Sequence, residues 1–131
     1  MHPQISSILL GVKEIGPAKK FYGEGLGCPI NQDHPGFVSF NLGEGSTALG
    51  LYTWDALAQD AGVPAEGGSG FHGFTLSYIV PSTQRVDEVM EKAKRAGAKI
   101  LKPAEKVQWG GYSGTFSDPV GYVWKIASSA S

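Results

Sequence analysis

The same order of secondary-structure signals occurs twice in this chain, and that duplication constrains the fold more than any other feature. In the first half, an apolar strand at residues 5–12 precedes a helix that begins at Gly16 and Pro17 and ends at Gly27. Proline suits the first turn of a helix, and glycine is common just past its end. Three short strands separated by glycine-containing turns then follow, at residues 29–33, 37–42 and 47–52. This half therefore has the order β-α-β-β-β.

The second half repeats that order. A strand at residues 74–80 precedes a helix with Ser82 as its candidate N-cap, and Gly97 ends this helix. Apolar residues at helical spacing predict its buried face, which contains Val86, Val89, Met90, Ala93 and Ala96. Three strands follow, at residues 99–101, 111–116 and 122–127. Because a repeat of this kind describes a whole architecture, we predict an α+β fold of paired βαβββ modules.

Length and composition bound the class of protein. The 131 residues predict one domain, with module one at about 4–53, a linker with a short helix at about 54–72, and module two at about 73–128. Eleven Lys and Arg oppose twelve Asp and Glu, and this net charge of −1 gives no reason to expect a nucleic-acid or membrane partner. No stretch approaches the ~20 apolar residues that span a bilayer. The single Cys28 and the lack of a signal-peptide pattern predict a cytoplasmic protein.

Two segments carry a resemblance to a known family, LLGVKEIGPAKKFYGEGLG near the start and FSDPVGYVWKIA near the end. With the duplicated order, they resemble the vicinal oxygen chelate superfamily, which includes glyoxalase I, extradiol dioxygenases, fosfomycin-resistance enzymes and bleomycin-resistance proteins. The segment LKPAEKVQWGGYSGTFSDPVGYVW is similar to a widespread, mostly uncharacterised glyoxalase-like branch. The resemblance implies a cupped, barrel-like mixed sheet with helices on its outer face, a cavity on the concave face, and a homodimer. Such folds host several unrelated activities.

Alternation along the strands predicts which residues face that cavity. On the final strand, Trp124 and Ile126 share the face that should pack against a helix, so we expect Lys125 to point into the cavity. On the strand at 47–52, the small residues on the face that contains Gly50 suggest open space. The larger apolar residues are expected to pack against the helices, namely Ile8, Leu10, Val12, Leu49, Leu51 and Tyr122.

The resemblance also implies four metal-ligand positions, which hold Ser7, Gly50, Thr75 (or Phe74) and Lys125 in this chain. Divalent ions prefer imidazole, carboxylate or thiolate ligands, and these residues supply none of them. An ammonium group at about 4 Å repels a divalent cation by several kcal/mol. We therefore predict no metal ion and no other cofactor, unless the ligands are relocated, with His72 as the first candidate.

Aromatic side chains are the main candidates for contact with a ligand. Trp109 stands beside two glycines, where it forms either a lid over the cavity or a cap on the core or on a dimer interface. Trp54 either stacks on a ligand or fastens the linker helix. The predicted ligand-binding set is Trp109, Tyr112, Lys125, Trp54, Tyr52, Phe40 and Ser77, with Phe37, Phe71, Phe74, Gln108 and Ser113 as further candidates.

Lys125 admits three interpretations. It binds an anionic group of a ligand, it pairs with an internal carboxylate such as Glu44 or Asp118, or its amine acts as a base or as a Schiff-base nucleophile. Pairing of a strand lysine within the protein is the commonest of the three. The sequence Asp118-Pro119-Val120-Gly121 is typical of a turn and needs no catalytic role.

Three classes of function fit this pattern: a small-molecule binding protein, an enzyme, and a protein that serves only as an interaction partner. The first is a metal-independent small-molecule binding protein of the glyoxalase and bleomycin-resistance type, which holds an aromatic or anionic metabolite or drug. The family precedent for it is antibiotic resistance by sequestration. The second is a lyase, isomerase or dioxygenase that uses a relocated metal ion or Lys125. We favour the binding protein because the usual metal ligands are absent and aromatic residues are numerous.

Overall fold

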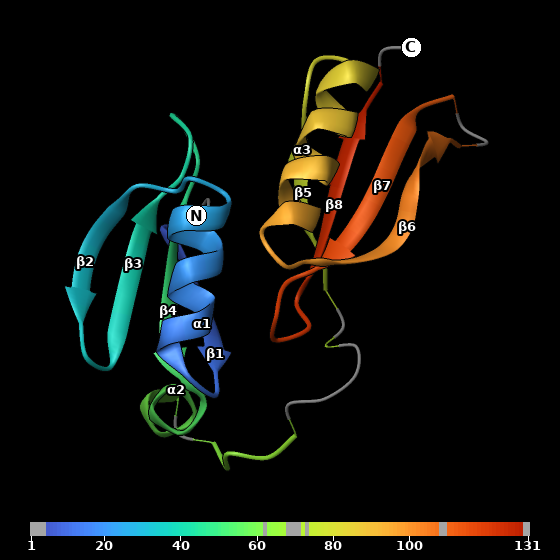
Figure 1. Cartoon of the computed structure of the whole chain (residues 1–131). Coiled ribbons are helices and arrows are strands. Elements are labelled where there is room, and N and C mark those ends of the chain that lie inside the picture. The colour runs from blue at the N-terminus through green and yellow to red at the C-terminus, as the bar shows by residue number, and fades with distance from the viewer. Residues whose placement is uncertain (1–4, 62, 68–71, 73, 108–109, 130–131) are drawn as a thin grey trace, which may run out of the picture. The chain divides into compact units, whose positions relative to one another are not determined.

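The computed structural model describes residues 5–61, 63–67, 72, 74–107 and 110–129. The chain divides into two compact units, Met1–Gly68 (unit 1) and Ser69–Ser131 (unit 2) (Figure 1). The boundary between the units falls inside the segment predicted as the linker.

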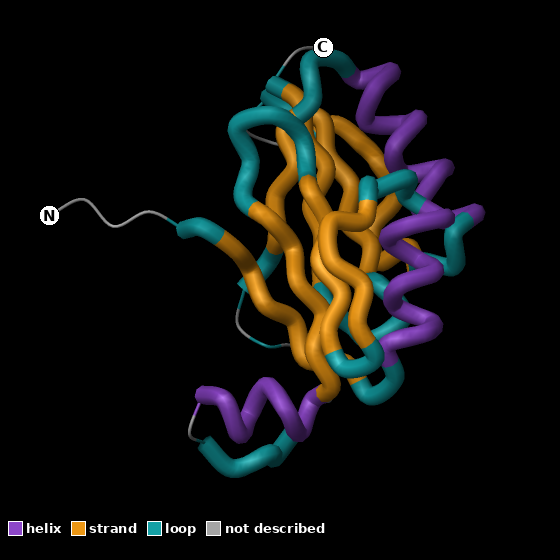
Figure 2. Tube along the Cα trace, turned by 90° about the vertical axis from the view of Figure 1, so that its left-hand side faces the viewer, coloured by secondary structure: helices purple, strands orange, loops and turns teal. Residues whose placement is uncertain are grey.

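Unit 1 contains a four-stranded mixed sheet with the strand order β1-β4-β3-β2, in which β1 runs parallel to β4 and the other pairs are antiparallel. A helix, α1, lies against β3 and β4, and a second helix, α2, packs against β1 and β4 at the lower ends of the strands (Figure 2). The elements are β1 (Ser7–Val12), α1 (Ile15–Lys20), η1 (Phe21–Gly25), β2 (Ile30–His34), β3 (Phe37–Asn41), β4 (Ala48–Thr53) and α2 (Trp54–Ala61).

The predicted single helix of module one is an α-helix that continues as a π-helical turn, η1. In this turn the Leu26 N–H donates to the Phe21 carbonyl, five residues earlier, at 2.9 Å. The wider turn accompanies two neighbouring aromatic side chains, Phe21 and Tyr22, which are both buried and have ring centroids 5.0 Å apart. Gly27, with a φ of 78°, ends the segment as the sequence predicted.

Unit 2 repeats the arrangement. Its sheet has the order β5-β8-β7-β6, with β5 parallel to β8 and the other pairs antiparallel, and one helix, α3, packs against β6, β7 and β8. The elements are β5 (Leu76–Ile79), α3 (Thr83–Arg95), β6 (Lys99–Lys106), β7 (Tyr112–Ser117) and β8 (Val123–Ser128). Two curved mixed sheets with helices therefore confirm the predicted α+β fold of βαβββ modules (Figure 1).

The ends of α3 follow from its sequence. Ser82 is the N-cap, and its Oγ accepts a hydrogen bond from the Arg85 N–H at 3.1 Å. Basic residues lie in the last turn, where they interact favourably with the helix dipole. Gly97 follows with a φ of 107°, a conformation that suits glycine. Of the predicted inner face, Val86, Met90 and Ala93 are buried.

One strand is much longer than predicted. The sequence predicted a strand only at residues 99–101, whereas the observed strand continues through Pro103, which has no N–H to donate to a neighbouring strand. The structure places β6 at the edge of its sheet and shifts its register against β7 between Lys102 and Glu105. A proline at an irregular position of an edge strand costs little pairing, so the strand continues to Lys106.

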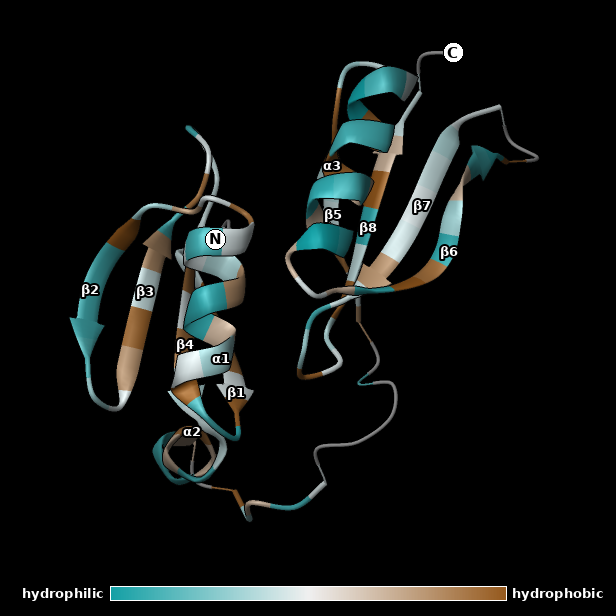
Figure 3. Cartoon of the chain, viewed as in Figure 1, coloured by the Kyte–Doolittle hydropathy of each residue, from teal (hydrophilic) through white to brown (hydrophobic). Residues whose placement is uncertain are grey.

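The helix-covered faces of the two sheets form the cores. Leu10, Val12, Leu49, Leu51 and Ile126 are each at most 1% exposed, which confirms the faces predicted from alternation. Figure 3 shows apolar residues along β3, β4 and β8, while the visible side of α3 is largely hydrophilic. In the part of the chain that the structure describes, no helix is long and apolar enough to cross a membrane.

Candidate ligand-binding surfaces

The sheet of unit 1 has a face directed away from α1, which we call the open face of unit 1. Strand register places Leu9 and Ser39 on either side of Gly50, and Phe37 opposite Tyr52. These positions alternate with the buried core residues of β1, β3 and β4. The open face therefore combines one aliphatic, two aromatic and two small residues over three strands.

Close packing over Gly50 is the main feature of this face. A Cβ atom added at Gly50 would lie 2.8 Å from Leu9 Cδ2 and 3.0 Å from Phe37 Cε1. The ring of Phe37 also contacts Tyr52, with centroids 4.6 Å apart. The expectation of open space beside Gly50 was wrong, because Leu9 and Phe37 cover this glycine.

Trp54, the first residue of α2, lies over the neighbouring glycine of β1. A Cβ atom at Gly11 would lie 3.0 Å from Trp54 Cε3 and 3.4 Å from Leu57 Cδ2. This contact agrees with one of the two interpretations of Trp54, in which its side chain packs α2 against β1. Because the side chain is only partly buried, its contact with a ligand stays a prediction.

Phe40 belongs to the core of unit 1. It is fully buried on the helix-covered face, with its ring 6.1 Å from that of Tyr22. Its assignment to the ligand-binding set is corrected, because it alternates with the open-face residues Phe37 and Ser39. The period of two along β3 could have shown this from the sequence.

The open face of unit 2 is polar. Register places Ser77 of β5, Lys125 of β8 and Thr115 of β7 side by side, on the face opposite to the buried Ile126. This confirms that Lys125 shares no face with Trp124, whose ring stacks on Phe116 at 6.4 Å. Lys125 is partly buried and Ser77 is exposed. This row offers one cation and two hydroxyl groups.

Tyr112 lies on the helix-covered face of unit 2. Its hydroxyl donates a hydrogen bond to Asp87 Oδ1 of α3 at 2.7 Å, and this bond to a carboxylate raises the pKa of Tyr112 above its ordinary value of 10.0. Tyr112 therefore joins β7 to α3. Its contact with a ligand stays a prediction.

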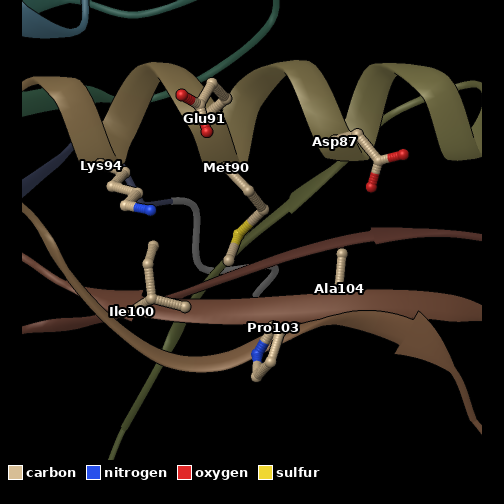
Figure 4. Close-up of a pocket in the computed structure, with 7 residues that line it drawn as sticks. All are labelled: Asp87, Met90, Glu91, Lys94, Ile100, Pro103 and Ala104. Carbon is tan, nitrogen blue, oxygen red and sulfur yellow. The ribbon is translucent and has the colours of Figure 1, made fainter.

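A groove of about 270 Å³ runs between α3 and β6 on this same helix-covered side. Figure 4 shows Met90 reaching from α3 toward the strand, with Asp87 and Glu91 along the helix. Asp87 already accepts from Tyr112, and Glu91 Oε1 is 3.4 Å from Arg95 Nε. The groove contains none of the predicted ligand-binding residues, since it is lined by Asp87, Met90, Glu91, Lys94, Ile100, Pro103 and Ala104.

Asp118 confirms the turn that its sequence indicates. One carboxylate oxygen, Oδ1, accepts hydrogen bonds from the backbone N–H groups of Val120, Gly121 and Tyr122 at 2.8–2.9 Å. Asp118 is 4% exposed, and its buried charge is satisfied largely by the backbone of its own turn. This carboxylate has a structural role.

Some predicted residues lie outside the described part of the chain: Trp109, Gln108 and Phe71. His72 is described, and its ring is 5.0 Å from that of Tyr122. Among the described residues, no three His, Cys, Asp or Glu side chains gather as a candidate metal centre. The four positions that the resemblance assigns to metal ligands do not fit a divalent ion. Gly50 has no side chain and is covered, and Lys125 supplies a cation.

The duplicated βαβββ fold is shared with a large class of proteins. A glyoxalase-related enzyme from Fulvimarina pelagi superposes with a TM-score of 0.85 at 29% identity, over 95% of this chain and 87% of that one. A glyoxalase/bleomycin resistance protein/dioxygenase family enzyme from Burkholderia phytofirmans gives 0.79 at 24%, over 94% and 96%. A lactoylglutathione lyase from Agrobacterium tumefaciens gives 0.73 at 18%, over 95% and 92%. The last two show the fold alone.

Residues 4–126 match the model of the Glyoxalase/Bleomycin resistance protein/Dioxygenase superfamily, so this chain belongs to that superfamily. No curated protein matches the sequence. Membership confirms the resemblance to this superfamily, whose members have several unrelated activities.

Proposed function

We propose that this chain is a small-molecule binding protein of the glyoxalase and bleomycin-resistance type, which binds an aromatic or anionic metabolite or drug without a metal ion. The observation that carries the proposal is the open face of unit 1. Phe37 and Tyr52 form a pair of partly buried rings, and Leu9 extends this apolar surface across Gly50. Planar aromatic ligands pack well on such surfaces.

The polar row of unit 2 supports the anionic part of the proposal. Lys125 is partly buried beside Ser77 and Thr115 on the open face of that unit. An ammonium with neighbouring hydroxyl groups suits a carboxylate or phosphate. The proposed ligand-binding residues are therefore Phe37, Tyr52, Trp54, Ser77, Lys125 and, outside the described residues, Trp109.

The donor chemistry supports metal-independent binding. The four assigned positions hold two neutral hydroxyl groups, one glycine and one lysine. A superfamily enzyme that polarises a substrate oxygen with a divalent ion needs stronger ligands at its centre. The homodimer that the superfamily resemblance implies belongs to the same proposal, and light scattering of the purified chain measures it.

Two measurements test the proposal. Elemental mass spectrometry is applied to protein purified without chelators or a histidine tag, before and after incubation with zinc, nickel, manganese and iron(II). We expect sub-stoichiometric metal throughout. A library of aromatic alcohols and acids is then screened by NMR, and we expect binders. Stoichiometric, tightly held metal would favour the enzyme with relocated ligands, and a library without binders would overturn the proposal.

Matched variants connect the binding to the two faces. Phe37→Ala should weaken binding of 2-naphthol by about 1–3 kcal/mol, because a stacking ring is lost. Phe37→Leu, which keeps an apolar side chain, should retain part of the affinity. Lys125→Gln should weaken binding of 2-naphthoate and leave that of 2-naphthol unchanged. If neither Phe37→Ala nor Lys125→Gln changes affinity, the binding surfaces lie elsewhere on the protein.

A further inference from the structure

Ser39 stands out on the open face of unit 1 because its hydroxyl is buried without a partner. The residue is 7% exposed, in the middle of β3, and lies opposite Gly50 on β4 and Gln32 on β2. Among the described residues, the structure gives its Oγ no hydrogen bond.

An unsatisfied buried hydroxyl is unfavourable for the folded protein. It loses its hydrogen bonds to water and gains none in return, so an alanine at the same place would be equally or more stable. Buried polar side chains in native proteins are nearly always paired, and an exception needs its own explanation. A ligand that supplies the missing partner is one such explanation.

The surroundings of Ser39 favour that explanation. The atoms nearest to a Cβ added at Gly50, the residue directly across from it, belong to the ends of two side chains, Leu9 and Phe37. Leu9 is 40% exposed and Phe37 is partly buried, so rotation about their side-chain bonds can admit a ligand beside Ser39. The hydroxyl thus stands at the base of an apolar and aromatic surface.

The lack of charged side chains at the described positions of this face restricts the class of ligand. The residues that the four strands place on this face include no Lys, Arg, Asp or Glu at the described positions. They are Ser7, Leu9, Gly11, Gln32, His34, Phe37, Ser39, Asn41, Ala48, Gly50 and Tyr52. A charged substituent buried here would lose its hydration without a counter-charge. An uncharged hydroxyl or carbonyl group would instead satisfy Ser39 at no such cost.

We propose that Ser39 is the polar anchor of the unit 1 open face, and that it selects planar aromatic ligands that carry an uncharged hydroxyl or carbonyl group. The aromatic ring packs on Phe37 and Leu9, and its substituent exchanges a hydrogen bond with the Ser39 hydroxyl. This inference rests on the proposed binding function and deepens it. It assigns specificity to one side chain.

The test compares 2-naphthol with naphthalene, which has the same ring system and no hydroxyl. Affinities of the full chain are measured by NMR titration with ¹⁵N-labelled protein. We expect 2-naphthol to bind about two- to tenfold more tightly than naphthalene, which is the range for one hydrogen bond. Ser39→Ala should remove this preference and leave naphthalene affinity unchanged. Ser46→Ala, in the exposed turn before β4, is the matched control and should keep the preference.

Thermal unfolding of the same variants separates a ligand anchor from a structural hydroxyl. Ser39→Ala should melt at the same temperature as the parent or higher, because it removes an unsatisfied group. A lower melting temperature would show that the hydroxyl bonds within the protein and would overturn the inference. Equal binding of 2-naphthol to parent and Ser39→Ala, or no binding of either probe while other library members bind, would also overturn it. These last outcomes leave the proposed binding function standing.

Discussion

The two units share one βαβββ scaffold and differ in what their open faces present. Unit 1 offers Leu9, Phe37 and Tyr52 over a glycine, whereas unit 2 offers a row of Ser77, Lys125 and Thr115. The helix-covered faces are alike, because both are filled by buried aliphatic and aromatic residues. The two units therefore have similar cores on their helix-covered faces and differ on their open faces.

The largest expected effect is a loss of stability that tests the distinction between the two faces of unit 1. Phe40→Ala should lower the free energy of unfolding by about 3–5 kcal/mol, because a fully buried ring leaves a cavity. Phe37→Ala, on the open face, should lower the free energy of unfolding by less than half of that amount. Chemical denaturation of both variants measures the difference. Equal losses would mean that the open face is part of the core.

The next prediction compares the stability cost of an alanine at one glycine in each unit, Gly114 and Gly50. A Cβ atom at Gly114 of unit 2 would lie 2.8 Å from Met90 Cε and 3.0 Å from the backbone N of Ala104. Since backbone cannot move aside as a side chain does, Gly114→Ala should cost about 1–3 kcal/mol of unfolding free energy. At Gly50 the atoms nearest to an added Cβ are the side-chain ends of Leu9 and Phe37, so Gly50→Ala should cost less. The reverse order in denaturation would contradict this account of the two glycines.

The helix N-termini give a smaller difference. Ser82→Ala should destabilise unit 2 by about 1 kcal/mol, because the cap on the Arg85 N–H is lost. Within the described chain, α1 has Glu14 as its N-cap without a side-chain capping bond. Glu14→Ser should therefore stabilise the protein by a few tenths of a kcal/mol or more. Denaturation midpoints test both, and a stabilising Ser82→Ala would refute the cap.

The smallest effect appears at alkaline pH and belongs to unit 2. The folded protein holds the Tyr112 proton more tightly than the unfolded chain, because Asp87 accepts its hydrogen bond. This contribution is fully present below pH 10.0 and is lost as pH rises through the raised folded pKa. Stability of the parent should therefore fall more steeply above that pH than that of Tyr112→Phe. If the free energy of unfolding falls equally with pH in both proteins, the raised pKa of Tyr112 does not contribute to stability.

Much of the fold could be predicted because its signals are local. The duplication, the Ser82 cap, the glycine stops and the alternation on β8 all appear in short windows of sequence. The strand β6 was predicted too short, and only the strand order shows that β6 is an edge, where Pro103 costs little pairing. The π-helical turn likewise accompanies the contact between Tyr22 and Phe40 of the sheet, which are far apart in the sequence.

The candidate site was less predictable, since it depends on which side chains meet. Lys125 was placed on the correct face by alternation alone. Phe40 and Tyr112 were assigned from their aromatic character, although one fills the core and the other binds Asp87. The cover over Gly50 and the unpartnered hydroxyl of Ser39 arise from contacts between strands that no single window of sequence contains.

The proline and shifted register of β6 also affect how this protein meets other chains. An edge strand exposes unpaired backbone groups that another polypeptide can pair with, which is a first step toward aggregation. On β6, Pro103 removes one donor, and the exposed Lys99, Lys102 and Lys106 place charge along the same strand. The edge strand β2 (Ile30–His34) also has a shifted register and is exposed throughout, but it contains no proline, and its carboxylate, Asp33, pairs with Lys19. Unwanted strand addition should therefore begin at β2 and be resisted at β6.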